Sequence, residues 1–171
     1  TIDLIRLEKE LYNFLQEVIY GSFMQEQVKP DARRISDIAL SGNGEPTSAK
    51  EFKQVIDIIG KIKFSFDALK DLKVVLITNG SLIDRENVQA GLRRLAEING
   101  EVWFKLDSVI RERRQQINNT RMSSRQVCSN LRLSASLCPT WIQTCVFKTD
   151  GNPPTSLETK AYLGFVEKLL Q

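Results

Sequence analysis

The sequence predicts an α/β protein built around a parallel sheet. Four short apolar segments are typical of buried strands, and each is followed by a segment with the features of a helix. Successive strand segments begin roughly 30–40 residues apart, about the length of a βαβ unit with its right-handed crossover. Both a barrel and a doubly wound sheet fit this order, and both place the binding site at the carboxyl ends of the strands.

The first part of the chain combines a leading helix, a loop and a strand. Residues 2–20 are predicted to be helical because five apolar side chains fall on one helical face: Leu4, Leu7, Leu11, Leu15 and Val18. Residues 21–34, which contain Pro30, are predicted to form a loop. The apolar run 35–40, stopped by Ser41 and Gly42, predicts the first strand.

The next strand–helix unit carries the clearest strand signal. Ser48 and Glu51 have the spacing of a capping box. The helix predicted after them has an apolar stripe made of Phe52, Val55, Ile56, Ile59 and Ile62. Residues 73–78 (KVVLIT) predict a buried strand, because four consecutive apolar residues are stopped by Asn79 and Gly80.

The third unit begins with a helix that we expect Asp84 to cap and Gly100 to end. Residues 102–106 predict the third strand. A polar, Arg-rich stretch follows, and a helix then begins near Ser123 and ends before Pro139.

The last unit contains a strand over residues 141–147 and a terminal helix. Thr155 and Glu158 form a second capping box after Pro153 and Pro154, which predicts a helix that runs to the end of the chain.

Composition excludes several classes of protein. The 171 residues are 42% hydrophobic and 26% charged, which excludes disordered, collagen-like and coiled-coil chains. A net charge of +3 is too small to indicate a nucleic-acid partner by itself. The chain contains no histidine, which excludes Ser/His and Cys/His nucleophile pairs and imidazole metal sites.

Three cysteines are too few for a disulfide framework or a zinc ribbon, and sparse thiols suit a reducing compartment, so we expect a cytoplasmic protein. We expect no membrane association, because no apolar run is long enough to span a bilayer and there is no signal-peptide pattern. Cys128 falls on an apolar helix face and Cys145 within a predicted strand, so we expect both to pack in the core. The chain starts at Thr1 rather than Met, which indicates a processed, trimmed or incomplete start.

The loop after the first strand, Ser41-Gly42-Asn43-Gly44-Glu45-Pro46-Thr47, fits a cation better than a phosphate. It lacks the third glycine of a dinucleotide fingerprint and the Lys-Ser/Thr ending of a phosphate loop, and Glu45 would repel an anion. Carbonyl groups and Glu45 can face an ammonium group, and glycines permit close approach. A tight turn in which Glu45 only favours the next helix fits the same residues.

Two further strand ends carry candidate polar residues. Lys105 and Asp107 lie two apart, so their side chains share one face of the third strand, where they could bind a zwitterion such as an amino acid or form a simple ion pair. Asn79 is either a ligand contact or a turn residue, and the turn is the commoner role.

Together these loops resemble the radical S-adenosylmethionine (SAM) superfamily. The similarity is greatest to radical SAM proteins of unknown substrate that have a Ser-Gly-x-Gly-Glu-Pro-Thr loop. It extends over roughly residues 31–171 through Thr-Asn-Gly-Ser-Leu at 78–82, Lys-Leu-Asp at 105–107, and the segments 117–120, 142–144 and 150–154.

The resemblance implies a partial (β/α)6 TIM-like barrel. It implies that the loop residues Gly42, Gly44, Glu45 and Pro46 receive the methionine ammonium group of SAM. Asn79, Lys105 and Asp107 occupy strand ends at which relatives contact the carboxylate or ribose of SAM, and Gln143 is a weaker candidate of this kind.

The cysteines depart from the family pattern. Members hold a 4Fe-4S cluster with a C-x-x-x-C-x-x-C loop after the first barrel strand, whereas here no cysteine precedes Cys128. By the resemblance that loop would stand just before Thr1. We therefore interpret residues 1–171 as a single partial radical SAM domain, incomplete at both ends: leading helix 2–20, loop 21–34, strand–helix units 35–171. None of these residues is expected to bind a metal.

The expected function is that of part of a radical SAM enzyme. The intact protein would cleave SAM reductively to a 5′-deoxyadenosyl radical, with an external electron donor and an unidentified substrate, and this chain alone would be inactive. The alternative is a non-catalytic truncated barrel that keeps only a SAM-like pocket or a scaffold role. A Rossmann-type SAM methyltransferase is disfavoured because the glycine fingerprint fails.

Five arginines lie close together in the polar stretch: Arg111, Arg113, Arg114, Arg121 and Arg125. They could bind a phosphate-bearing substrate such as RNA. We favour a solvated helix face instead, because the stretch has no aromatic stacking partners.

Overall fold

Four parallel strands form one sheet whose order in space repeats the order along the chain. The computed structural model describes residues 1–42, 44–149 and 151–169. The strands pair in the order β1-β2-β3-β4, and their bounds are Asp37–Leu40 for β1, Lys73–Thr78 for β2, Gly100–Lys105 for β3 and Thr140–Gln143 for β4. The prediction of an α/β protein with a parallel sheet is confirmed.

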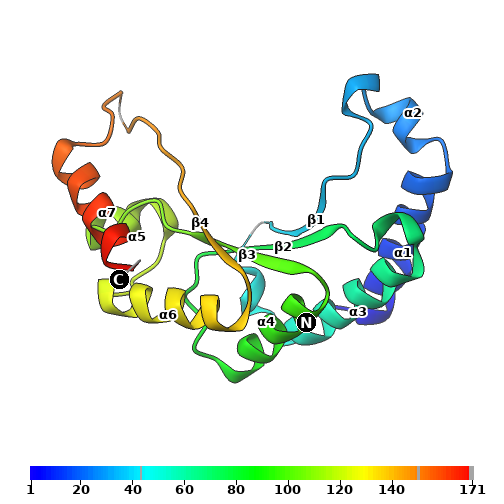
Figure 1. Ribbon diagram of the computed structural model, residues 1–171, viewed down its shortest axis with the longest axis horizontal. Coiled ribbons are helices and arrows are strands. Elements are labelled where there is room, and N and C mark those ends of the chain that lie inside the picture. The colour runs from blue at the N-terminus through cyan, green and yellow to red at the C-terminus, as the bar shows by residue number, and fades with distance from the viewer. Residues whose placement is uncertain (43, 150, 170–171) are drawn as a thin grey trace.

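Four helices lie on one face of this sheet (Figure 1). They are α1 (Leu4–Tyr20), which precedes β1, and α3 (Phe52–Ser65), α4 (Glu86–Glu97) and α6 (Ser124–Leu137), which lie between successive strands. Each of the four packs against the next of the four. The sequence allowed a barrel or a doubly wound sheet. Within the described residues the strand order has no reversal, which a doubly wound sheet requires.

The core lies between the sheet and these helices. The strand register pairs Leu76 with Val102 on the covered face, where Val74 and Phe104 also lie, and all four side chains are fully buried. The apolar stripes predicted from the sequence supply the helix side, with Phe52, Ile56, Ile59, Val88, Leu92 and Leu95 all buried. Burial of these side chains is the main force that holds the units together.

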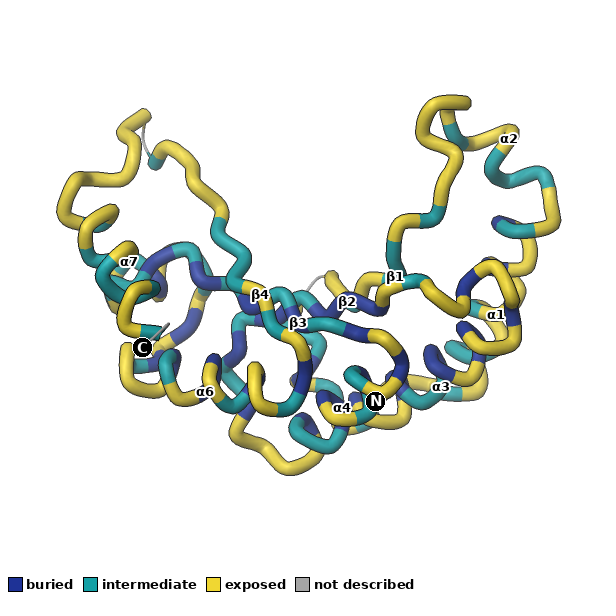
Figure 2. Tube along the Cα trace, viewed as in Figure 1, coloured by how far each residue is buried: buried dark blue, intermediate teal, exposed yellow. Residues whose placement is uncertain are grey.

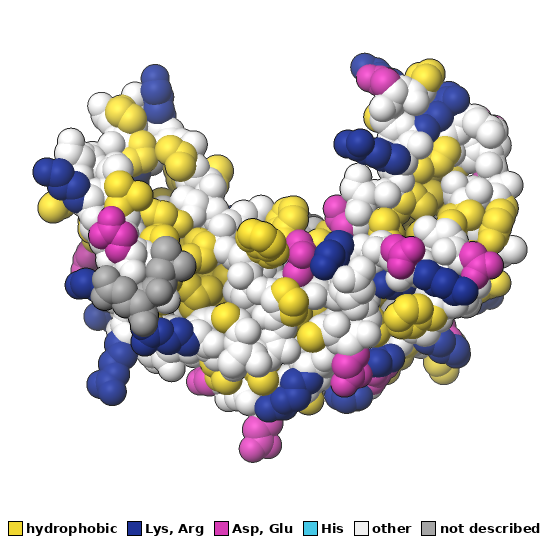
Figure 3. Space-filling view, in the orientation of Figure 1, with side chains coloured by type: hydrophobic (Ala, Val, Ile, Leu, Met, Phe, Trp, Pro, Cys, Tyr) yellow, Lys and Arg dark blue, Asp and Glu magenta, His cyan; other side chains and the backbone are white. Residues whose placement is uncertain are grey.

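The other face of the sheet is open. Trp103 and Trp141 are register partners on it, and the Trp141 side chain is 62% exposed. Two largely exposed arms rise on either side of this face (Figure 2), and a hollow separates them (Figure 3). One arm contains α2 (Phe23–Gln27), and the other contains residues 144–149 and 151–155 and helix α7 (Ser156–Leu169). No helix in the described residues has the length and apolar character that crossing a membrane would require.

Several local predictions are confirmed. The strand over residues 73–78 has the predicted bounds. The helix expected near Ser123 begins there with a complete capping box. Thr155 and Glu158 also cap each other as predicted: the Thr155 amide donates to Glu158 at 2.7 Å, and the Glu158 amide donates to Thr155 Oγ1 at 3.2 Å.

Three predicted helix ends are wrong. Ser48 does not cap α3, because it belongs to a 3-10 turn, Pro46–Ser48, whose cap is Glu45. The cap of α4 is Arg85 and not Asp84. The left-handed residue after α4 is Asn99 (φ 62°), and Gly100 is already the first residue of β3.

Two segments differ from their predicted structure. The predicted loop 21–34 contains α2 and a 3-10 turn, Pro30–Ala32. The last strand ends at Gln143 rather than residue 147, because the amide of Cys145 donates to the Asp107 carboxylate at 2.7 Å and leaves the sheet.

Candidate functional site

The carboxyl ends of the four strands meet at one edge of the sheet, as parallel pairing requires, and the predicted site residues follow these ends. The structure brings them together in two groups. The first is the loop after β1 with Asn79 after β2. The second is Lys105, Asp107 and Gln143 at the ends of β3 and β4. Since Thr78 and Phe104 are register partners, Asn79 and Lys105 follow at adjacent strand ends.

The Glu45 carboxylate ties the first loop to the end of β2. Its Oε1 accepts from Thr78 Oγ1 at 2.5 Å, from Thr47 Oγ1 at 2.6 Å and from the Thr47 amide at 3.2 Å. Its Oε2 accepts from the Asn79 amide at 2.8 Å. Four donors nearly fill the acceptor sites of one carboxylate, so Glu45 holds the loop in place. The carbonyls of Gly42, Glu45 and Pro46 each accept one backbone amide, and their second lone pairs are left to face a cation.

The glycines of this loop have no packing role that the structure shows. A Cβ added at Gly42 or Gly44 would meet no described atom within 4 Å, and neither residue has a positive φ. Both line a cavity of about 340 Å³ together with Glu45 and Pro46. The fold therefore accepts a side chain at Gly42 and Gly44, and close approach of another molecule would explain why none is present.

Asn79 has the local role of a turn residue. Its Oδ1 accepts from the Ser81 amide at 2.9 Å, which is the geometry of an Asx turn. The turn continues through Gly80, whose φ is +72° and whose amide donates to Thr78 Oγ1 at 3.0 Å. Contact of Asn79 with a ligand stays a prediction.

The Asp107 carboxylate ties the second pair of loops together. Its side chain is 1% exposed and accepts from Asn118 Nδ2 at 2.5 Å and from the Cys145 amide at 2.7 Å. Lys105 Nζ lies 3.7 Å from the same carboxylate, so the two side chains form an ion pair, although β3 ends at Lys105 and Asp107 follows the strand. The Lys105 side chain is 43% exposed, so its ammonium group can still reach a ligand.

Two acceptors beside this pair lack donors. Gln143 Oε1 and Asn118 Oδ1 are buried and have no hydrogen-bond partner among the described residues. Buried unpaired acceptors are costly and often mark a place where another molecule completes the bonding. Asn118 belongs to the 117–120 segment quoted in the resemblance but was not among the predicted site residues. The signal that could have found it was its place in that segment.

The cysteines do not fit an iron–sulfur cluster. Cys128 on α6 is partly buried, Cys138 at the end of α6 is buried, and Cys145 after β4 is exposed. No three His, Cys, Asp or Glu side chains gather as a metal site in the part of the chain that the structure describes. The expectation that Cys145 packs in the core is wrong, because the strand ends before it.

The three thiols are expected to differ sharply in reactivity. Burial raises the pKa of the Cys138 thiol to about 12, so almost none of it is thiolate at pH 8. We expect iodoacetamide to alkylate Cys145 rapidly and to leave Cys138 unmodified until the protein is unfolded in guanidinium, as read by peptide mass spectrometry. Alkylation of native Cys138 at the rate of Cys145 would contradict the burial of this thiol.

Two of the five clustered arginines are not on a solvated face. Arg114 on α5 (Arg111–Asn118) is 2% exposed and donates to the carbonyls of Ser108 and Met122 at 3.2 and 2.7 Å. Desolvation lowers the pKa of its guanidinium group. Arg113 is paired with Glu158 at 3.2 Å and bonded to Thr149. These two side chains are therefore committed to contacts inside the protein.

Comparison with known proteins gives no family: no family model matches the chain, and no curated protein or solved structure matches it significantly.

Two residues of the predicted motifs, Asn43 and Asp150, lie outside the described residues.

Proposed function

We propose that this chain is part of a radical SAM domain and supplies a SAM-binding edge. The proposed fold of the intact domain is a (β/α)6 barrel, of which the four strands form part. The strand order and the placement of α3, α4 and α6 on one face of the sheet support this proposal, because a barrel is built from such singly wound units. The proposed reaction is reductive cleavage of SAM to a 5′-deoxyadenosyl radical, which then acts on an unidentified substrate. The thiols of this chain do not fit the cluster, so its proposed ligands are cysteines outside these residues.

One observation carries the proposal. The Glu45 carboxylate fixes a glycine loop at the carboxyl edge, and this loop lines a cavity at two positions where the fold would accept side chains. The carbonyls of Gly42, Glu45 and Pro46 each accept one backbone amide. Each keeps a second lone pair, and a fixed loop of such carbonyl groups suits the ammonium group of a bound amino acid. In this proposal Glu45 positions the loop, and Gly42, Gly44 and Pro46 form the surface that SAM contacts.

The second group complements the first in charge. The methionine part of SAM is a zwitterion, and Lys105 offers a half-exposed ammonium group for its carboxylate. The unpaired oxygens of Gln143 and Asn118 are acceptors that suit the ribose hydroxyls. Asp107 holds Lys105 and Asn118 in position for both roles.

Calorimetry with SAM tests this site on the chain as it stands. We expect Lys105→Ala and Gly44→Ala each to weaken binding about tenfold, the cost of one charge-assisted bond or of a blocked close approach. Gly164→Ala is the matched control, because Gly164 is also open to an added Cβ but lies on α7. Binding that is equally strong in all three variants would place SAM elsewhere.

The alternative is a non-catalytic barrel fragment with a scaffold role, and the misfit between the thiols and a cluster favours it. The calorimetric titration with SAM distinguishes this alternative from the SAM-binding proposal. Absence of any heat of binding with SAM, in a chain that unfolds cooperatively in urea, would favour the scaffold.

A further inference from the structure

A second cavity lies between α5, the segment that follows β4, and α7. Its volume is about 310 Å³, at the lower end of the range of small-molecule sites. A cavity of this size holds a molecule of one or two rings. It lies beside the carboxyl ends of β3 and β4 and shares only Asp107 with the residues predicted to bind SAM.

The surface of its wall is more apolar than polar, and five apolar side chains contribute to it. They come from all three segments and are Ile117, Val146, Phe147, Pro154 and Leu163. Val146 is 77% exposed and Leu163 is 55% exposed, so part of this wall faces solvent. An apolar ligand would remove that surface from water, which favours binding.

The charged groups of the wall already have partners. Arg113 forms an ion pair with Glu158, and the Asp107 carboxylate accepts from Asn118 and the Cys145 amide, with Lys105 close by. Because a charged ligand would bring a charge without a free partner into this wall, the cavity suits a neutral molecule.

The hydroxyl groups in the wall show which polar group the ligand needs. Thr144 Oγ1 donates its hydrogen to the Leu106 carbonyl at 3.1 Å and is also bonded to Tyr162 Oη. Since Thr144 has a single hydrogen, Tyr162 must donate in their shared bond. The Tyr162 oxygen keeps its lone pairs, so it can accept from a ligand donor.

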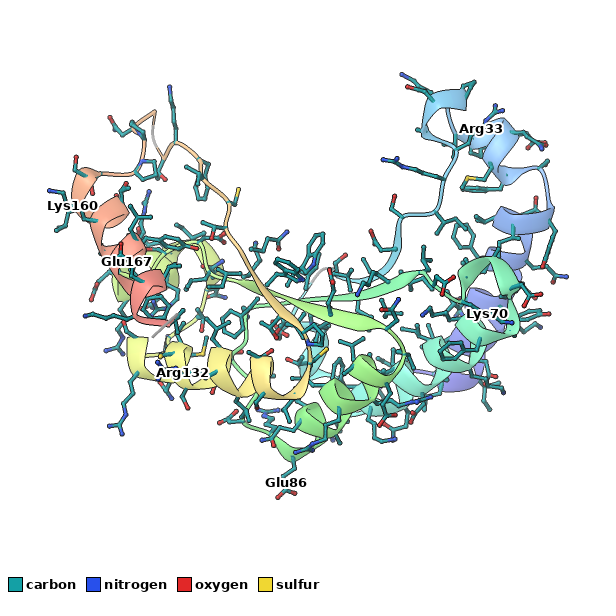
Figure 4. All side chains as sticks on the ribbon, in the orientation of Figure 1. Arg33, Lys70, Glu86, Arg132, Lys160 and Glu167 are labelled. Atoms are coloured by element: carbon teal, nitrogen blue, oxygen red, sulfur yellow. The ribbon has the colours of Figure 1, made fainter. Side chains whose placement is uncertain are left out.

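Helix α7 is held over the cavity by hydrogen bonds and an ion pair of its side chains, and not by fully buried side chains. Glu158 and Tyr162 bind it to Arg113 and Thr144, and Arg132 on α6, which is labelled in Figure 4, donates to the Lys168 carbonyl at 3.3 Å. Among its described residues none is fully buried, although Tyr162, Phe165 and Leu169 pack against the core. The wall is therefore fixed in place without filling the space beneath it.

We propose that this cavity binds a neutral, ring-sized molecule that donates one hydrogen bond to Tyr162. The inference stands apart from SAM binding, since it rests on different side chains. It makes the region between α5 and α7 a small-molecule site in its own right.

Alkylation of Cys145 provides the test, because this exposed thiol also lines the cavity. The probes are 2-naphthol and 2-methoxynaphthalene, two neutral ring systems of which only the first is a donor. We expect 2-naphthol to slow the reaction of Cys145 with iodoacetamide in a saturable way. The concentration that gives half-maximal protection should be about tenfold lower for 2-naphthol than for 2-methoxynaphthalene, the ratio expected for one hydrogen bond. In Tyr162→Phe the two probes should protect equally.

Controls keep the test specific to the cavity. Leu163→Trp should fill the space and abolish protection, whereas Leu157→Trp, on the same helix but outside the cavity wall, should retain it. Alkylation of Cys128 on α6 should not respond to either probe. Absence of saturable protection, or equal protection in Leu163→Trp, would overturn the proposal. Either result would leave SAM binding untouched, because that is read from variants at Gly44 and Lys105.

Discussion

Replacing Gly80 by alanine is expected to lower the free energy of unfolding by about 2–5 kcal/mol, the combined cost of a left-handed residue and of overpacking. Gly80 has a φ of +72°, and a Cβ there would lie 2.1 Å from ring atoms of Phe104, which is fully buried. The Gly80 carbonyl also accepts from the buried Asn130 side chain at 2.8 Å. The ring and the turn must therefore both move to admit a methyl group.

Gly151→Ala separates the cost of a left-handed backbone from the cost of overpacking against Phe104. Gly151 has a similar φ of +80°, but a Cβ there would meet no described atom within 4 Å. It should cost about 1 kcal/mol, from backbone strain alone. Urea unfolding of both variants measures the difference. Equal losses would show that the Phe104 ring does not close on the turn after β2.

The second large effect is expected at Glu45. Glu45→Ala removes the acceptor for four hydrogen bonds and leaves the Asn79 amide and the Thr78 hydroxyl without this partner. Hydrogen bonds to a charged group are the stronger kind, and these bonds are not additive, so we expect a loss of about 2–4 kcal/mol. The loop after β1 should separate from the end of β2.

Glu45→Gln should cost less, because the amide can keep most of the arrangement. With its oxygen toward the Asn79 amide, its NH2 group can donate to the hydroxyls of Thr47 and Thr78, which rotate to accept. Only the bond from the Thr47 amide is then lost. Glu51→Ala is the control, since this neighbouring carboxylate makes no capping bond to α3. Urea unfolding measures both variants. A free energy of unfolding for Glu45→Ala that is equal to or above that of Glu51→Ala would contradict the role of Glu45 in joining the loop to the end of β2.

The features that the sequence predicts well depend on neighbouring residues. Lys73–Thr78 is a strand because its apolar run and the turn after it lie within eight residues. The Thr155–Glu158 cap needs only two side chains three residues apart. The parallel sheet followed from the spacing of such units, each of which carries its own signal.

The features that it missed depend on partners outside the helix or strand that carries the pattern, between 6 and 38 residues away. Ser48 and Glu51 have the spacing of a cap, but Glu45 closes an earlier turn and binds Thr78, 33 residues away. Cys145 has the sequence context of a strand, but Asp107 draws its amide out of the sheet. Arg114 has the context of a solvated helix, but the carbonyls of Ser108 and Met122 surround it. No local pattern contains these pairings.

The candidate site also has parts that the sequence predicts and a part that it does not. The glycine loop and the Lys105–Asp107 pair are visible as motifs, and the structure places both at the carboxyl edge. The cavity at Tyr162 is not visible, because α5, the segment after β4 and α7 contribute to it from separate parts of the sequence. Only the fold shows that their side chains share one space.

The strand order has a consequence for how the protein is made. Each strand pairs with the strand synthesised just before it, and α3, α4 and α6 each pack against the helix before them in the series α1, α3, α4, α6. Contacts between consecutive units cost little loop-closure entropy and form early during folding. On the ribosome, each emerging unit therefore finds its partner already present, so the sheet can assemble in the order of translation.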